Sequence, residues 1–295
     1  MISVLTVLCL AGAALGQQTT VQRLAGDPDN RFTTLVSLVT QAGLVDTLNN
    51  GNFTIFAPTN AAFAALPADV TAAVTGNATV LKDVLLYHVL PGFVPSSAAT
   101  DELLVDTAAG AKARFNIYTH NNVITIQGCV VSQPDLVCSN GVIHVIDSVM
   151  MKPSQNLVEY VASNPQLSTL LMLVQNASLA QPLLKDGLTL FAPTNDAFAR
   201  LSQAEIDDLL ANPAKLAAVL TYHVIGSTEY SVGLYQKENL ATLNPNDQLS
   251  VHMVHHGADV KVNNALVTAA NIGVTNGVIH LVDHVLIPHG DPIVG

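Results

Sequence analysis

The feature that most constrains the fold of this chain is an eleven-residue phrase that occurs twice. FTIFAPTNAAF runs from Phe53 to Phe63, and LTLFAPTNDAF runs from Leu188 to Phe198, 135 residues later. A unit of this length is too long for a solenoid repeat and has the size of an independent domain. Two other landmarks recur at the same offset within one residue: Tyr87-His88 with Tyr222-His223, and NGVIH starting at Asn140 and at Asn276. The sequence therefore predicts a tandem duplication of one compact unit.

The amino-terminal segment predicts export. It is apolar from Ile2 to Leu15 and ends in small residues, which is typical of a secretory signal peptide that is cleaved after Gly16. A membrane anchor is the alternative, but the apolar run is shorter than the ~18–20 residues that a membrane-spanning helix needs. With a seam at Pro153, the predicted organisation is residues 1–16 signal peptide, 17–152 first domain and 153–290 second domain.

The composition narrows the class of partner. Only 11% of the residues are charged, whereas a typical soluble domain has roughly 25%. The surface must therefore be built largely from neutral polar and small side chains. The net charge of −11 argues against nucleic acid, because binding to phosphates requires clustered Lys and Arg. A weakly charged surface with apolar patches is suited to contacts with other proteins.

Each unit is predicted to mix helices with strands. The repeated phrase indicates a strand that turns into a helix after Pro58, with Thr59 or Asn60 capping the helix. The segment after the Asn140 turn is apolar on both faces, so we expect a central strand of a sheet. The segments ARFNIY, VITIQG and CVVSQ also have the composition of strands.

The Tyr-His pairs lie at the end of a predicted helix. Apolar residues share one helical face with His88, and the same spacing recurs before His223. A histidine on an apolar face is usually a hydrogen-bonded core residue, so both histidines are expected to be buried. Tyr87 and Tyr222 lie about 100° away on the helix, and we expect them to be exposed.

The cysteines and the sequons are consistent with a secreted protein. Cys9 lies in the predicted signal peptide, which leaves Cys129 and Cys138 as a candidate disulfide, with two free thiols as the alternative. Three Asn-x-Ser/Thr sequons, at Asn52, Asn77 and Asn176, are candidate glycosylation sites. Glycosylation would require all three to be exposed.

The repeated landmarks resemble the fasciclin domain. FTIFAPTNAAF is similar to its first signature box, the Tyr-His pair to its middle landmark, and NGVIHVIDSVMMKP to its second box. The resemblance implies an α+β fold, in which each of two tandem domains is a wedge of two small β-sheets with packed helices. It also implies extracellular adhesion or matrix assembly without catalysis. The implied partners are matrix proteins such as collagen, or cell-surface receptors such as integrins, and the implied adhesion candidates are Tyr87, His88, Tyr222 and His223.

Two other functions are weighed against adhesion. The chain has no GxSxG, HExxH, GxGxxG or paired-carboxylate motif, so no enzyme class and no cofactor is expected. Convergence of His144 and Asp147 in a cleft would favour an enzyme. A metal- or mineral-associated matrix component, such as a shell or skeletal protein, is the alternative function, based on six histidines: His252, His255, His256, His280, His284 and His289. Because only His252 and His256 of the HMVHH segment would share a strand face, no metal site is predicted from it.

Overall fold

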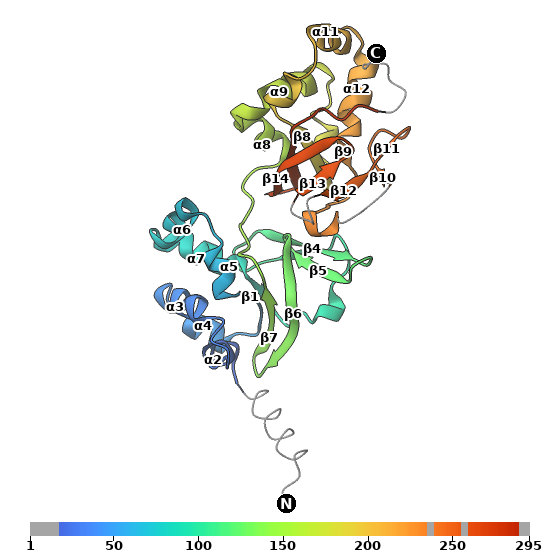
Figure 1. Ribbon diagram of the computed structural model, residues 1–295. Helices are drawn as coiled ribbons and strands as arrows, with labels where there is room; N and C mark the ends of the chain where they lie inside the picture. The colour runs from blue at the N-terminus through green and yellow to red at the C-terminus, as the bar shows by residue number, and fades with distance from the viewer. Residues whose placement is uncertain (1–17, 235–238, 255–258, 289–295) are drawn as a thin grey trace, which may run out of the picture. The chain divides into compact units, whose positions relative to one another are not determined.

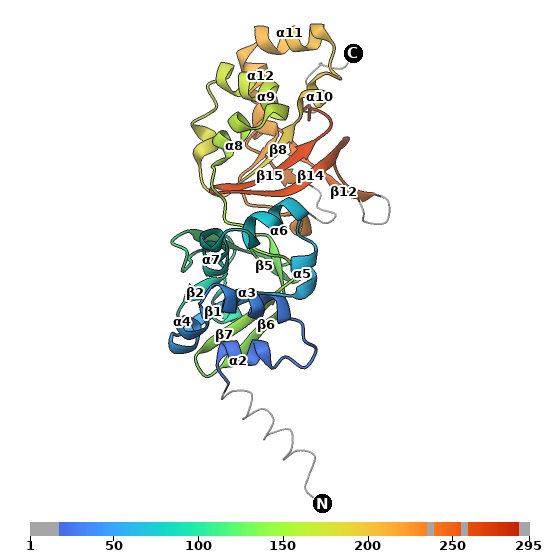
Figure 2. The ribbon, with the colours of Figure 1, turned by 90° about the vertical axis from the view of Figure 1, so that its left-hand side faces the viewer.

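The computed structural model describes residues 18–234, 239–254 and 259–288. The predicted signal peptide, residues 1–16, lies outside the described residues. The chain divides after Lys152 into two compact units, and each combines helices with strands (Figures 1 and 2). The predicted α+β class is therefore confirmed. None of the helices in the described ranges is both long and apolar enough to cross a membrane.

Unit 1 is built around one curled sheet. Its elements are α2 (Thr20–Ala25), α3 (Thr33–Gln41), α4 (Val45–Asn50), β1 (Phe53–Pro58), α5 (Asn60–Ala64), α6 (Ala68–Thr75), α7 (Ala78–Tyr87), β2 (Val89–Pro91), β3 (Leu104–Asp106), β4 (Lys112–Tyr118), β5 (Val123–Ile126), β6 (Cys129–Cys138) and β7 (Gly141–Ile146), with a 3-10 turn at Ser96–Ala98. The strand order is β2-β1-β7-β6-β5-β4-β3. The long strand β6 pairs with β7 and with β5, so it joins the two halves of the sheet.

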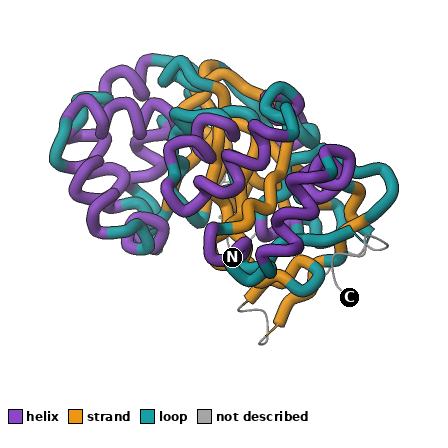
Figure 3. Tube along the Cα trace, turned by 90° about the horizontal axis from the view of Figure 1, so that it is seen from above, coloured by secondary structure: helices purple, strands orange, loops and turns teal. Residues whose placement is uncertain are grey.

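Unit 2 repeats this plan. Its elements are α8 (Leu157–Ser163), α9 (Ser168–Asn176), β8 (Leu188–Pro193), α10 (Asn195–Phe198), α11 (Gln203–Ala211), α12 (Pro213–Tyr222), β9 (Val224–Ile225), β10 (Leu240–Ala241), β11 (Gln248–Leu249), β12 (Val251–Val254), β13 (Asp259–Val262), β14 (Ala265–Val274) and β15 (Gly277–Val282), with 3-10 turns at Pro165–Leu167, Pro182–Leu184 and Ser231–Gly233. The main sheet has the order β12-β13-β14-β15-β8-β9, and β10 pairs with β11 separately. Figure 3 marks these helices and strands along the chain trace.

The centre of each sheet is a parallel pair that contains both repeated boxes. In unit 1, β1 runs parallel to β7, with Phe53 opposite Gly141 and Pro58 opposite Ile146. In unit 2, β8 pairs with β15 in the same register. Every residue of β7 and of β15 is buried, and each strand has a partner on both sides. The prediction of a central strand after the Asn-Gly turn is therefore confirmed.

The two faces of this parallel pair are covered by different layers. On one face of unit 1, Ile55 and Ile143 pack with the helices in a cluster that we call the helix core. On the other face, Phe56 and Ile146 pack with residues of the outer strands, among them Phe115 of β4, in the sheet core. Figure 1 shows the helices of unit 1 gathered on one side of β1 and β7, with β4 and β5 on the other. Alternate residues of one strand thus belong to separate cores.

The Thr-Asn pair of the repeated phrase joins the turn between β1 and α5 to the earlier helix α3. Thr59 is the N-cap of α5, and its Oγ1 accepts a hydrogen bond from the Ala62 amide at 3.3 Å, as predicted. Asn60 does not cap its own helix, because its Oδ1 accepts from the Thr34 amide of α3 at 2.9 Å and its Nδ2 donates to the Asn30 carbonyl at 2.9 Å. In unit 2, Thr194 and Asn195 make the matching contacts with Ala197, Thr169 and Pro165.

The Asn-Gly turn joins the central strand to the amino-terminal helices. The Asn140 Nδ2 donates to the Leu48 carbonyl at 2.7 Å, and its Oδ1 accepts from the Thr20 amide at 2.8 Å. In unit 2, Asn276 donates to Leu183 and accepts from Leu157 in the same way. A Cβ placed on Gly141 would lie 1.8 Å from the Phe53 carbonyl oxygen, so a larger residue there would break the parallel pairing.

We expect Gly141→Ala to destabilise unit 1 by about 3 kcal/mol or more, because the obstructing atom is ladder backbone that has no room to move. Gly277→Ala should do the same to unit 2, where the Cβ would lie 1.9 Å from the Leu188 carbonyl oxygen. Gly110→Ala is the control, since its Cβ meets nothing within 4 Å and only its φ of 71° causes strain, worth about 1–2 kcal/mol. Urea unfolding followed by circular dichroism measures all three. Equal decreases in the free energy of unfolding for Gly110→Ala and Gly141→Ala would contradict the idea that a Cβ at Gly141 collides with the Phe53 backbone.

Candidate functional site

Tyr87 ends helix α7 and lies inside unit 1. It is 0% exposed, and its hydroxyl donates to the Lys112 carbonyl of β4 at 3.0 Å. In unit 2, Tyr222 is also 0% exposed, and its hydroxyl donates to the Gln248 carbonyl at 2.9 Å. The prediction that the tyrosines are exposed is therefore wrong. The helix stops at this residue, and the outer strands cover the side that helical spacing assigned to solvent.

The neighbouring His88 forms a fixed link between two segments of backbone. Its Nδ1 lies 2.8 Å from the Val84 carbonyl, which can only accept, and its Nε2 lies 2.9 Å from the Met150 amide, which can only donate. The ring is therefore neutral, with its proton on Nδ1. Burial lowers the pKa of His88 to about 4. The link ties the end of α7 to the segment that follows the central strand, and the predicted burial is confirmed.

His223 makes the same link in unit 2. Its Nδ1–H donates to the Val219 carbonyl at 2.8 Å, and its Nε2 accepts from the Leu286 amide at 2.9 Å. Burial lowers the pKa of His223 to about 4. The Tyr-His landmark of both units is thus a pair of internal ties, one to an outer strand and one to the segment after the central strand.

A second histidine in each unit holds an irregular segment that crosses the sheet. We call residues 92–96 and 227–231 the strap segments. In unit 1, the Thr54 hydroxyl donates to the Gly92 carbonyl at 2.9 Å and accepts from the Val94 amide at 2.8 Å. His144 of β7 then donates from Nε2 to the Val94 carbonyl at 2.9 Å. These hydrogen bonds attach the strap first to β1 and then to β7.

The strap ends on β6. The Asp135 carboxylate accepts hydrogen bonds from the Ser96 hydroxyl and, at 2.8 Å, from the Ser96 amide. The same three anchors recur in unit 2, where Thr189 bonds to Ser227 and Glu229, His280 bonds to the Glu229 carbonyl, and Asn271 bonds to Ser231. Sequence reasoning missed the straps, because their residues form no periodic pattern.

His144 and Asp147 do not converge in a cleft. His144 is 2% exposed, stacks on Phe56 with ring centroids 5.4 Å apart, and accepts at Nδ1 from the Asp135 amide at 3.2 Å. Burial lowers the pKa of His144. The Asp147 carboxylate instead accepts from the Val130 amide at 3.0 Å. Both groups are therefore engaged with backbone.

Cys129 and Cys138 do not form the predicted disulfide. They are the first and last residues of the ten-residue strand β6, which separates them by on the order of 25–30 Å. A disulfide requires Cα atoms about 4.4–6.8 Å apart. Cys129 lies in the sheet core and Cys138 in the helix core, both as free thiols. Burial raises the pKa of each. An even count in a secreted chain suggested pairing, but the segment between them is extended.

Three of the six histidines considered for metal binding are described by the structure, and these three have different surroundings. His255, His256 and His289 lie outside the described residues. His252 is exposed, whereas His280 is fully buried on Phe191, and His284 bonds to Asp283 at 2.8 Å. Within the three described ranges, no group of three or more His, Cys, Asp or Glu is placed to hold a metal ion.

The three sequons are exposed, as predicted. Asn52 precedes β1, Asn77 is the N-cap of α7 and Asn176 ends α9. The Asn77 Oδ1 accepts from the Thr79 amide at 2.9 Å, which leaves its nitrogen available for a sugar. Glycosylation itself stays a prediction.

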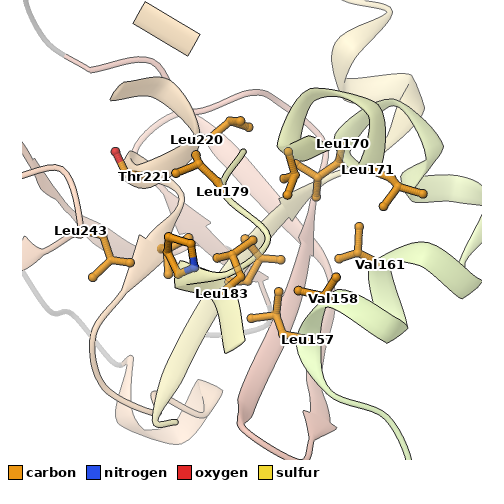
Figure 4. Close-up of a pocket in the computed structure, with 14 residues that line it drawn as sticks. Leu157, Val158, Val161, Leu170, Leu171, Leu179, Leu183, Leu220, Thr221 and Leu243 are labelled. Carbon is orange, nitrogen blue, oxygen red and sulfur yellow. The ribbon is translucent and has the colours of Figure 1, made fainter. Parts of the chain in front are cut away.

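Both units contain a small apolar cavity at the same place. In unit 2 it has a volume of about 30 Å³ and lies between α8, α9, β8 and α12 (Figure 4). In unit 1 its counterpart has about 20 Å³. Equivalent residues line the two: Leu157, Leu170, Leu183 and Leu220 in unit 2, and Val21, Leu35, Leu48 and Leu85 in unit 1. Such volumes hold about one water, and their apolar lining disfavours it, so they are packing voids.

The sequence profile of the fasciclin domain matches residues 30–152 and 165–288, which is most of the chain. The chain belongs to the fasciclin family. Its two fasciclin domains correspond to the two structural units.

Two relatives found among curated proteins are longer than this fasciclin chain. Transforming growth factor-beta-induced protein ig-h3 of Oryctolagus cuniculus is 30% identical over 245 residues, which cover 81% of this chain and 35% of that protein. Periostin of Homo sapiens is 27% identical over 241 residues, covering 81% and 28%. The chain thus spans about a third of the length of these relatives. A solved domain pair from the insect cell adhesion molecule fasciclin I aligns with 89% of this chain and 99% of that one, with 20% identity and a TM-score of 0.42.

We expect acid to destabilise both fasciclin domains. The pKa of His88 and of His223 falls from about 6.5 in the unfolded chain to about 4 in the fold, so the unfolded chain binds more protons between these values. The stabilisation is complete above about pH 6.5 and is lost as the pH falls toward 4. The slope is about 1.4 kcal/mol per pH unit for each histidine, or about 2 kcal/mol each between pH 7 and pH 5.

Urea unfolding at several pH values measures this loss. His88→Gln should lower the stability of unit 1 at pH 7 and make its pH dependence shallower. His120→Gln changes an exposed histidine and serves as the control. A free energy of unfolding that stays constant between pH 7 and pH 5 would contradict the conclusion that His88 and His223 are held neutral in the folded protein.

Proposed function

We propose that this fasciclin-family chain is a secreted extracellular adhesion or matrix protein that acts through protein–protein contacts and is not an enzyme. Family membership supports the adhesive class. The apolar leader and the exposed sequons Asn52, Asn77 and Asn176 support export. The proposed partners are extracellular matrix proteins or integrin-like cell-surface receptors.

The observation that carries this proposal is a pair of exposed apolar side chains on the strap face of unit 1. Phe93 of the strap is 48% exposed and Val137 of β6 is 54% exposed. Val137 lies opposite Val142, which lies opposite Thr54, so these residues form one row across the sheet. Neighbouring strands are about 4.8 Å apart, which places Val137 about 10 Å from the hydroxyl that anchors the strap beside Phe93. An exposed aromatic ring and an exposed aliphatic group on the same face of a unit are a suitable centre for a protein contact.

The Tyr-His candidates act indirectly in this proposal. Tyr87 and His88 are buried, so neither is available to touch a partner. They fix the end of α7, from which β2 and then the strap continue. A substitution that unfolds this junction would abolish adhesion without removing a contact. Tyr222 and His223 have the same role in unit 2.

We assign the adhesive surface to unit 1. The positions equivalent to Phe93 and Val137 in unit 2 are Thr228 and Gly273. Neither offers a large apolar side chain, although the strap of unit 2 is anchored in the same way. Unit 2 lacks the exposed apolar pair but keeps the hydrogen bonds that hold the strap. This is consistent with a structural role for the strap of unit 2.

We expect the double variant Phe93→Ser, Val137→Ser to bind cells and collagen-coated surfaces at least about tenfold more weakly than the unchanged chain, since central apolar contacts are worth about 1–2 kcal/mol each. A solid-phase assay with the full two-unit chain measures this. The matched control is Leu184→Ser, Leu210→Ser, which removes two side chains of unit 2 that are 44% and 41% exposed.

The variant Tyr87→Phe tests whether Tyr87 stabilises the fold or touches the partner. It should lower stability by about 1 kcal/mol, through loss of one hydrogen bond, and leave adhesion unchanged. Unaltered binding by the Phe93, Val137 variant would refute this surface. Failure of the folded, unchanged chain to bind any cell or matrix protein would refute the adhesive function itself.

A further inference from the structure

The two Asn-Gly turns contain a step of the chain that is chemically labile. In an asparagine-glycine step, the glycine nitrogen can attack the asparagine Cγ, because glycine has no side chain to shield its nitrogen. A C–N bond forms, and the side-chain nitrogen takes the glycine amide proton and leaves as ammonia. Water then opens the cyclic succinimide to aspartate or isoaspartate. The chain has three such steps, at Asn50, Asn140 and Asn276.

In unit 1 the structure holds the Asn140 carboxamide at both ends. Its Oδ1 accepts from the Thr20 amide at 2.8 Å. Its Nδ2 donates to three backbone carbonyls, at 2.7, 3.2 and 3.1 Å, which belong to Leu48, Asn49 and Gly51. Because both ends are bonded to other segments, the carboxamide is not free to turn its carbon toward the nitrogen of the glycine that follows.

Unit 2 holds Asn276 in the same way. Its Oδ1 accepts from the Leu157 amide at 2.9 Å, and its Nδ2 donates to the carbonyls of Leu183 at 2.9 Å and Lys185 at 3.0 Å. The residue is only 8% exposed. By contrast, Asn50 is exposed at the end of α4.

We propose that Asn140 and Asn276 are latent deamidation sites. Each is protected while its unit is folded, and each becomes reactive when the unit opens and the carboxamide loses its partners. The product cannot rebuild the contacts of the turn, so a unit that reacts while unfolded does not return to the native state. This property does not depend on the adhesive function.

The reaction blocks refolding because it exchanges a donor for a charged acceptor. A carboxylate at position 140 has no N–H to donate, and its negative oxygens would face the carbonyl oxygens that now accept from Nδ2. The hydrogen bonds that attach α4 to the start of β7 would be lost, and a buried charge would stand without a partner. Isoaspartate would also lengthen the backbone beside Gly141, where a Cβ alone would lie 1.8 Å from the Phe53 carbonyl oxygen.

The first measurement compares reaction rates in the full chain with Asn50→Gln, which removes the exposed third step. One sample stays folded and another is kept in guanidinium chloride at the same mildly alkaline pH, and peptide mass spectrometry follows conversion at Asn140 and Asn276. We expect conversion to be at least about tenfold faster in the unfolded sample, since a folded unit reacts only during rare opening. Similar rates in the two samples would overturn the proposal.

The second measurement asks which chains refold. The unfolded sample is diluted after partial conversion, and limited proteolysis removes the units that have not refolded. We expect the protease-resistant units to retain asparagine at positions 140 and 276, and the aspartate and isoaspartate forms to be digested. Converted residues that remain in resistant units in the same proportion as before refolding would overturn the proposal.

Two variants isolate the effect of the new charge. Asn140→Asp should leave unit 1 sensitive to protease, because it makes the aspartate product directly. Asn50→Asp is the matched control, since it introduces the same charge at an exposed position, and it should refold like the unchanged chain. Equal protease resistance of the two variants would contradict the role of the Asn140 donor.

Discussion

The rest of each unit depends on one parallel strand pair. Parallel neighbours cannot be joined by a tight turn, so the chain must leave the end of one strand and return to the start of the other. In unit 1 everything between Pro58 and Gly141 is that return path, and it supplies α7, the strap and the outer strands. The backbone of Phe53 approaches Gly141 so closely that a Cβ there would lie 1.8 Å from the Phe53 carbonyl oxygen. The two signature boxes are thus the two halves of one contact, far apart in sequence.

Much of this arrangement could be predicted from the sequence, because it leaves local signals. Burial of β7 on both faces and the hydrogen-bonded core position of His88 follow from the spacing of apolar residues. Tyr87 could not be placed correctly, since helical spacing ignores the strand β4 that covers the helix end. The disulfide between Cys129 and Cys138 was predicted wrongly, because an even number of cysteines says nothing about the distance between them. The straps are visible only in three dimensions, where Thr54 and its partners come together.

The comparison of the two units separates residues that maintain the fold from residues that are free to change. Hydrogen bonds of the corner, the Asn-Gly turn, the Tyr-His pair and the strap recur almost one for one. The differences include an exposed residue, Phe93, whose counterpart is the buried Thr228, and a core residue, Phe32, whose counterpart is Leu167. Duplication therefore kept one hydrogen-bonded framework while side chains in the core and on the surface changed.

The position of the Asn-Gly turn has a mechanical consequence. In unit 1 the first helix is bonded to Asn140 at the start of β7, and the chain leaves the unit beyond the end of that same strand. Because β1 starts opposite Gly141, tension applied between the two ends of the unit pulls β1 toward its start and β7 toward its end, and so slides these two parallel strands past each other. Such shear loads many ladder bonds at once, whereas peeling would break them one at a time. Leu157 and Asn276 give unit 2 the same geometry.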